Sequence, residues 1–178
     1  VMSVTIPAQQ NYVPNSYGLG ANTMVAVTHN IYDTFLKFRS VGGCVKLQLY
    51  GDDITLKTIT LKGNENEKLA GRAFVKAAYG QAPTLSMADD ATSTITLNCG
   101  EGVVLDEETP IVFMIMLPPT TFEKGITITM KDINGKIYTQ STSNQLVVER
   151  NVIKPMAAFE VKDFPNNEPY VPVPGEWK

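Results

Sequence analysis

The segment from Ile126 to Thr142 alternates between apolar and polar residues around an Asn134–Gly135 pair. In an extended chain Ile128 and Met130 fall on one face, and the neighbouring threonines fall on the other. Asn-Gly between two alternating runs is the strongest short-range signal for a hairpin with a two-residue type I′ turn. Because a strand with one apolar and one polar face is typical of antiparallel sheets, this segment predicts an antiparallel hairpin.

Most of the remaining chain repeats this pattern, and no alternation of strands with helical segments appears. Short strands separated by turn residues, at a spacing of roughly 8–12 residues, are typical of sandwiches and barrels. The sequence therefore predicts an all-β protein, an antiparallel two-sheet β-sandwich with little or no helix. We expect strands at residues 1–6, 24–28, 34–39, 44–50, 54–61, 69–78, 92–99, 103–105, 111–117, 126–142 (the hairpin), 144–149 and 156–162.

Four details refine this expectation. Prolines, glycines and asparagines predict that residues 7–23 form a loop, and Gly100–Gly102 is expected to turn the chain. A phase slip between Leu56 and Ile59 indicates a bulge. The continuous apolar run Ile111–Leu117 is interpreted as a central strand buried on both faces.

Charge and hydropathy exclude several classes of protein. The 15 Lys and Arg residues against 18 Asp and Glu residues give a net charge of −3, and no basic run stands out, so nucleic-acid binding is disfavoured. Only 19% of residues are charged, which favours an extracellular β protein. No apolar run reaches the roughly 18 residues that a transmembrane helix needs.

Cys44 and Cys99 are the only cysteines, which is too few for a disulfide framework. Both lie in apolar strand-like runs. Because a free cysteine often serves as a small core residue, we expect two buried thiols. A bridge between neighbouring strands is the alternative.

Residues with catalytic or metal-binding chemistry are sparse. His29 is the only histidine, and it lies in a turn rich in Asn and Thr, which argues against a catalytic triad and against a zinc site. The acidic groups Asp52–Asp53, Asp89–Asp90 and Asp106–Glu108 lie in turns, where carboxylates are usually solvated. The loop Asn64–Glu67 offers oxygen ligands but lacks the spacing of a calcium loop. We therefore expect no enzyme activity, catalytic residue, cofactor or metal.

Residues 163–178 form a Pro-rich tail that cannot be a regular central strand. Its apolar residues are candidates for contact with a partner, along a sheet edge or groove. They are Tyr170, Val171, Val173 and Trp177.

Six segments, in this order, resemble the fimbrillin-like surface proteins of gut and oral Gram-negative anaerobes. They are Pro7–Tyr12, Asn22–Ala26, Phe38–Gly43, Leu97–Gly100, Leu117–Phe122 and Arg150–Met156. The resemblance implies a pilus-like fibre subunit or adhesin of the fimbrium, made as a lipoprotein and exported to the outer membrane and cell surface. It implies Greek-key or transthyretin-like sandwich domains whose partners are other fimbrial subunits or copies of the chain itself, joined by strand addition, with a host or glycan ligand also possible.

The resemblance also divides the chain. Residues 34–162 are expected to form the sandwich, and residues 1–33 to be either the closing strands of a truncated N-terminal β domain or the first strands of the sandwich. We expect the natural protein to continue before Val1 and to carry its lipid anchor there. The alternative function is that of a glycan-binding module of the same surface, which predicts two or three coplanar exposed aromatic rings.

Overall fold

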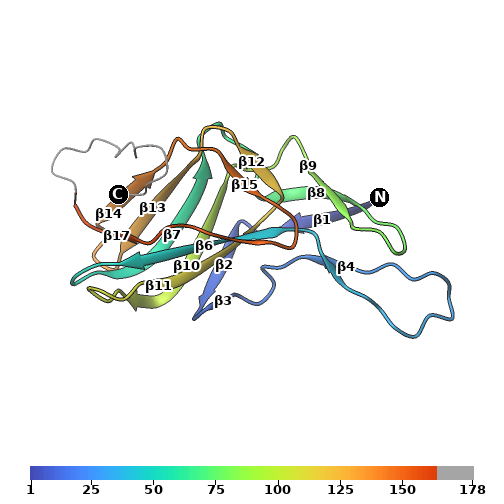
Figure 1. Ribbon diagram of the computed structural model, residues 1–178, viewed down its shortest axis with the longest axis horizontal. Coiled ribbons are helices and arrows are strands. Elements are labelled where there is room, and N and C mark those ends of the chain that lie inside the picture. The colour runs from blue at the N-terminus through green and yellow to red at the C-terminus, as the bar shows by residue number, and fades with distance from the viewer. Residues whose placement is uncertain (164–178) are drawn as a thin grey trace.

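The computed structural model describes residues 1–163, and every regular element in this range is a β-strand (Figure 1). The described residues contain no helix long and apolar enough to cross a membrane. The first strands are β1 (Met2–Ile6), β2 (Gln9–Val13), β3 (Ser16–Tyr17), β4 (Met24–Val25), β5 (Arg39–Ser40), β6 (Gly43–Tyr50), β7 (Thr55–Gly63), β8 (Gly71–Lys76) and β9 (Thr84–Met87). The others are β10 (Thr94–Val104), β11 (Ile111–Leu117), β12 (Thr120–Phe122), β13 (Ile126–Asp132), β14 (Ile137–Ser141), β15 (Leu146–Val148), β16 (Ile153–Pro155) and β17 (Phe159–Glu160).

The strands form several sheets. The largest has the order β14-β13-β7-β10-β2-β3, and a second has the order β11-β6-β16, with β17 also paired to β6. Smaller sheets are β1-β8-β9, β12-β15 and β4-β5. The chain is therefore all-β, whereas the simple two-sheet Greek-key arrangement stays a prediction. The pairing is not purely antiparallel, because β2 runs parallel to β10, and β16 and β17 run parallel to β6.

The larger hydrophobic core lies between the six-stranded sheet and the sheet that contains β6. Ile59 and Leu61 of β7 enter it from one side, and Leu47 of β6 with Phe113 and Ile115 of β11 enter it from the other, all fully buried. From Val45 to Tyr50 of β6, buried and half-buried residues alternate, which matches the expected alternation of Val45, Leu47 and Leu49.

The prediction that residues 7–23 form a loop is wrong, because β2 and β3 lie inside this range. Pro7 and Pro14 flank β2 and do not interrupt it, so the strand keeps every backbone N–H that the ladder needs. The pairing of β2 with β10 joins residues far apart in sequence, which local composition cannot indicate.

β11 is buried on both faces over most of its length, as expected, but it stands at the edge of its sheet and not at its centre. Phe113 and Ile115 face the larger core, while Met114 and Met116 pack with Ala21 in a separate cluster. The free edge of β11 is partly satisfied by a side chain. The Gln10 amide donates to the Met116 carbonyl at 2.6 Å, and the Met116 N–H donates to the Gln10 Oε1 at 3.0 Å.

The predicted hairpin forms, but its turn differs from the expected type I′. Gly135 is the one turn residue with a positive φ, +84°, and its N–H donates to the Asp132 carbonyl at 3.1 Å. Asp132 Oδ1 also accepts the N–H groups of Asn134 and Lys136, each at 2.8 Å. The arrangement fits a longer loop, a tight turn followed by a left-handed glycine, because Asp132 competes for the backbone donors.

Of two further expectations, for β7 and β10, one is confirmed and the other is wrong. The bulge predicted between Leu56 and Ile59 is confirmed, since the registers of β7 with β10 and with β13 both shift there. Gly100–Gly102 does not end the strand. β10 runs through these residues, because positive φ values at Gly100 and Gly102, +62° and +124°, let the extra residues bulge out within the ladder.

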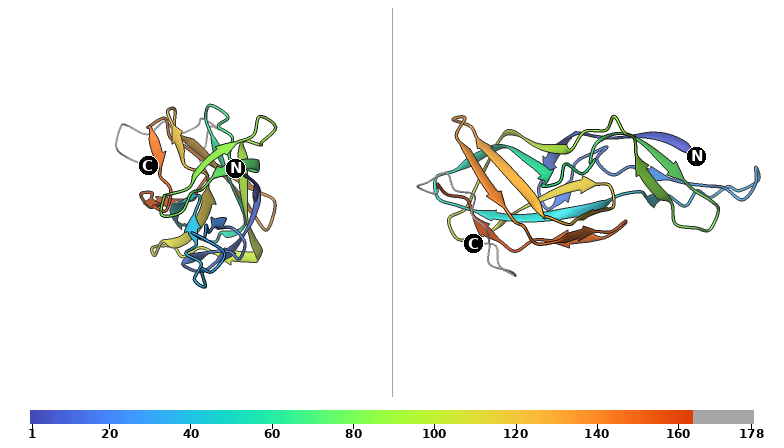
Figure 2. Two further views of the ribbon diagram at one scale, coloured as in Figure 1. Left: turned by 90° about the vertical axis from the view of Figure 1, so that its right-hand side faces the viewer. Right: turned by 90° about the horizontal axis from the view of Figure 1, so that it is seen from above.

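The sheet β1-β8-β9 lies at one end of the elongated molecule, beside the short pair β4-β5 (Figures 1 and 2). A small second core, in which Ile6, Val25 and Val75 are buried, joins these elements. The predicted strand at residues 34–39 is wrong apart from its end, because only Arg39 and Ser40 pair with β4. Residues 26–38 instead form a long loop that extends from this end of the molecule.

Candidate interaction surface

Residues 26–38, here called the tip loop, connect β4 to β5 and project beyond the sheets (Figure 2). The two strands pair only through Met24 with Ser40 and Val25 with Arg39. The long connection is therefore held by its own local contacts rather than by a strand ladder.

Side chains in the middle of the tip loop form hydrogen bonds with its own backbone. The Asp33 carboxylate accepts the N–H of His29 and, at 3.3 Å, the N–H of Asn30. The side-chain oxygen of Asn30 accepts the N–H of Tyr32 at 2.8 Å. Asn and Asp favour such turns because their short polar side chains replace backbone partners. These contacts shape the loop without burying its apolar residues.

The tip loop exposes an unusual number of large apolar side chains. Ile31, Phe35 and Tyr32 are 90%, 86% and 82% exposed, and Leu36 and Phe38 are more than half exposed. We call these five residues the apolar set. Single exposed apolar side chains are ordinary, but five on one 13-residue segment are unusual and make the tip loop a candidate interaction site.

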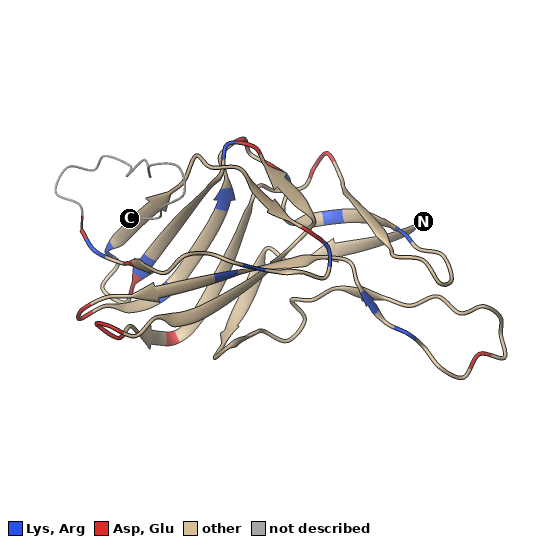
Figure 3. Ribbon diagram, viewed as in Figure 1, with Lys and Arg blue, Asp and Glu red and all other residues tan. Residues whose placement is uncertain are grey.

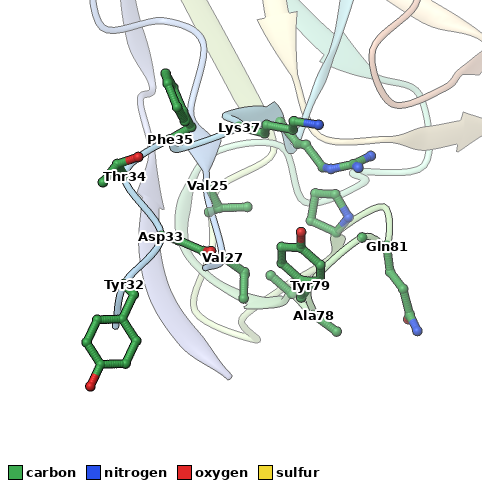
Figure 4. A pocket seen from close by; sticks show the side chains of 14 residues that line it. Val25, Val27, Tyr32, Asp33, Thr34, Phe35, Lys37, Ala78, Tyr79 and Gln81 are labelled. Carbon is green, nitrogen blue, oxygen red and sulfur yellow. The ribbon is translucent and has the colours of Figure 1, made fainter. Parts of the chain in front are cut away.

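The tip loop also contacts the hairpin between β8 and β9. The rings of His29 and Tyr79 lie 5.0 Å apart between centroids, at an interplanar angle of 53°. Between the two segments is a pocket of about 340 Å³ (Figure 4). Its lining includes Val25, Val27, Asp33, Lys37, Arg39, Tyr79 and Pro83.

The aromatic residues beside this pocket do not form a flat platform. Figure 4 shows the ring of Tyr79 at the pocket, while the rings of Tyr32 and Phe35 point away from it in different directions. The coplanar rings that the glycan-binding alternative predicts are therefore not formed by these three residues.

Two of the acidic groups considered as catalytic candidates have local structural roles. Asp106 Oδ1 accepts the N–H groups of Glu108 at 2.9 Å and Thr109 at 2.6 Å, and these bonds lower the pKa of Asp106. Asp90 forms an exposed ion pair with Arg72 at 3.2 Å. Such contacts stabilise turns and strand ends.

The Asn64–Glu67 loop is also organised by protein contacts. The Asn64 amide donates to the carbonyls of Lys124 at 2.6 Å and Thr142 at 2.8 Å, and Glu67 Oε2 accepts the N–H of Glu65 at 3.1 Å. Within residues 1–163, no three His, Cys, Asp or Glu side chains gather closely enough to hold a metal ion.

Cys44 and Cys99 are both buried and free, which confirms the first interpretation of the cysteines and rules out the bridge between strands. Burial raises the pKa of each thiol from its ordinary value of 9.0 to about 11. Both thiols are therefore protonated near neutral pH and behave as core residues.

The contact residues predicted in the tail, Tyr170, Val171, Val173 and Trp177, lie outside the described residues. The apolar set, in contrast, was not predicted as a surface, because the segment resembles a half-buried strand. The sequence nevertheless carried a signal for a turn. Asn30, which precedes the apolar set, and Asp33, which interrupts it, are both residues that favour turns.

Comparison with known protein families and with curated proteins gives no match. Among solved structures, the chain is similar to the crystal structure of a Bacteroides ovatus ATCC 8483 protein with a proposed role in cell adhesion. The TM-score is 0.48 and the sequence identity 14%, and the match covers 70% of this chain and 41% of that protein. The chain thus spans less than half of that protein's length.

Proposed function

We propose that this chain belongs to a cell-surface adhesion protein, a structural subunit of a pilus-like fimbrium, which acts through protein–protein assembly and not through catalysis. In this proposal the protein is exported and held at the outer membrane by a lipid anchor. Two β-sandwich layers, the six-stranded sheet and the sheet containing β6, form its rigid body. The fimbrillin-like segments of the sequence support the family, and the exposed apolar set is the observation that carries the proposal.

The chemistry of the apolar set favours a protein partner. Ile31 and Leu36 offer aliphatic surface that a polar ligand would not use, while Tyr32 and Phe35 are of the type that anchors protein interfaces. Burying such side chains yields roughly 25 cal/mol per Å² of apolar area removed from water.

The position of the tip loop favours a second copy of the chain as the partner. The loop lies at one extreme of an elongated molecule (Figures 1 and 2). A patch at one end that binds a different surface of the next copy produces a head-to-tail contact, and repeated head-to-tail contacts build a fibre.

Strand addition is a second route for contact at the same end. Within the described residues, β1 and β9 each pair only with β8, so both outer edges of this sheet lack a partner strand. Open edges carry unpaired N–H and C=O groups and accept strands from other chains. A neighbouring subunit that docks on the tip loop would lie close to these edges.

Sedimentation velocity over a concentration series tests the proposal. The test variant replaces three members of the apolar set, I31S, F35S and L36S. The control variant replaces three apolar residues that are more than half exposed elsewhere, V104S, I133S and I137S.

We expect the wild-type chain and the control to associate as concentration rises, while the tip variant stays monomeric with an unchanged melting temperature. A tip variant that associates like the wild type would overturn the proposal. A wild-type chain that stays monomeric at its highest soluble concentration would also overturn it.

A further inference from the structure

The pocket behind the tip loop has the mixed lining of a small-ligand site. Val25 and Val27 provide apolar walls, Tyr79 provides an aromatic ring, and Thr34 and Gln81 add polar side chains (Figure 4). Its volume of about 340 Å³ lies at the lower end of the usual range for such sites, roughly 300–1,000 Å³.

Two cations line this pocket without an acidic partner. Neither Lys37 nor Arg39 forms a salt bridge within residues 1–163, although three other Lys or Arg side chains do. Arg39 is half-buried, whereas Lys37 is exposed. Figure 3 shows basic positions along the segment that leads into β5.

The one acidic residue of the lining is already engaged. Asp33 Oδ2 accepts the backbone N–H groups of His29 and Asn30, which hold the carboxylate in the turn of the loop. Two cations against one such anion leave the pocket positive in a chain of net charge −3. A guanidinium binds a carboxylate through two parallel hydrogen bonds, so an anionic ligand suits Arg39.

The ring of Tyr79 favours a ligand that carries a ring as well as a carboxylate. Tyr79 is more than half exposed, and one side of its ring contacts His29. An exposed aromatic face accepts the apolar C–H face of a sugar ring. A free carboxylate without a ring would leave this aromatic surface unused.

We propose that this pocket binds one carboxylate-bearing sugar residue of a glycan. Lys37 and Arg39 would hold the carboxylate, and Tyr79 would stack on the sugar ring. This ligand site goes beyond the proposed self-association. Tyr32 and Phe35 of the apolar set also line the pocket, but the proposed ligand contacts, Lys37, Arg39 and Tyr79, lie outside that set, so variants of these three residues test the site separately.

Nuclear magnetic resonance titrations of the chain with three small probes test the proposal. Methyl β-glucuronide carries a ring and a carboxylate, methyl β-glucoside carries the ring alone, and N-acetylalanine carries a carboxylate on an amino acid. We expect the glucuronide to shift the amides of residues 37–39 and 77–81, and to bind about tenfold or more tightly than either other probe, because bonds to charged groups are the stronger ones.

Matched variants locate the site. R39Q and Y79A should each weaken glucuronide binding about tenfold or more, whereas R72Q, which removes an exposed arginine outside the pocket, should not change it. Because Arg39 is half-buried, K37Q provides a second test at an exposed position. No glucuronide shifts, equal binding of the glucoside, or equal binding of N-acetylalanine would each overturn the acidic-sugar site, the last in favour of a peptide carboxylate.

Discussion

The side chain of Gln10 bonds the backbone of the edge strand β11, as a neighbouring strand would. Its carboxamide pairs with both the N–H and the C=O of Met116, and the side chain is only 3% exposed. The amide thereby satisfies part of the free edge of β11 and ties that edge to β2 of the other sheet. A polar side chain in a core is stable only when it is bonded in this way.

Replacing Gln10 by Ala should destabilise the fold, because two buried backbone groups lose their partner at about 1–3 kcal/mol each. Urea denaturation of Q10A measures the loss. Q9A is the matched control, since Gln9 is the exposed neighbour on the same strand and should cost little. Equal midpoints for the two variants would mean that the Gln10 contacts contribute nothing.

The buried thiols make stability depend on alkaline pH. Folding raises the pKa of Cys44 and Cys99 from 9.0 to about 11, so the folded state retains their protons longer than the unfolded state does. This contribution to stability is present below pH 9 and is lost as pH rises towards 11.

Urea midpoints measured from pH 8 to 11 should therefore fall, and they should fall less steeply in the double variant C44A/C99A. Identical slopes in the two proteins would show that the thiols do not titrate as described. Thiol reagents at neutral pH should react only after denaturation, because both side chains are buried.

Among elements, the hairpin of β13 and β14 depends on one backbone conformation. Gly135 has a φ of +84°, and a side chain added there would meet no close atom, since the nearest is 3.9 Å away. The cost of substitution is therefore conformational. G135V should destabilise by about 1–3 kcal/mol, because β-branched residues resist positive φ.

G135N is the control for this position, since Asn tolerates the left-handed region. Thermal denaturation should rank the proteins as wild type, then G135N, then G135V. If valine were tolerated as well as asparagine, the left-handed turn would be contradicted.

The elements also show how far local patterns determine this fold. Alternation predicted β6, β13 and the bulge in β7, because each depends on residues that are near neighbours in sequence. The parallel strand β2 and the edge position of β11 depend on pairing between distant segments, which periodicity does not encode.

The candidate site was harder to predict for the same reason. Residues 34–38 have the apolar content of a strand, but they pair with no strand, because β4 ends at Val25 and β5 begins only at Arg39. Whether an apolar side chain meets a core or the solvent depends on the rest of the fold. The exposed apolar set and the pocket behind it therefore became visible only in the structure.

At the scale of the whole molecule, a larger and a smaller hydrophobic core lie apart from each other. The larger core lies between the six-stranded sheet and the sheet containing β6. The smaller core anchors the tip loop and the β8–β9 hairpin at the far end of the molecule (Figure 1). Under the proposed function, exposed apolar side chains at one end of an elongated molecule join copies end to end.

Hydrogen exchange followed by mass spectrometry, on the wild-type chain at low and at high concentration, tests this central claim most directly. The tip loop has few backbone bonds of its own, so its amides should exchange fast in the dilute monomer. At high concentration we expect exchange to slow in residues 31–38, while the hairpin turn at residues 132–136, where the control substitution I133S lies, stays unchanged. Exchange in residues 31–38 that does not change with concentration would contradict the account.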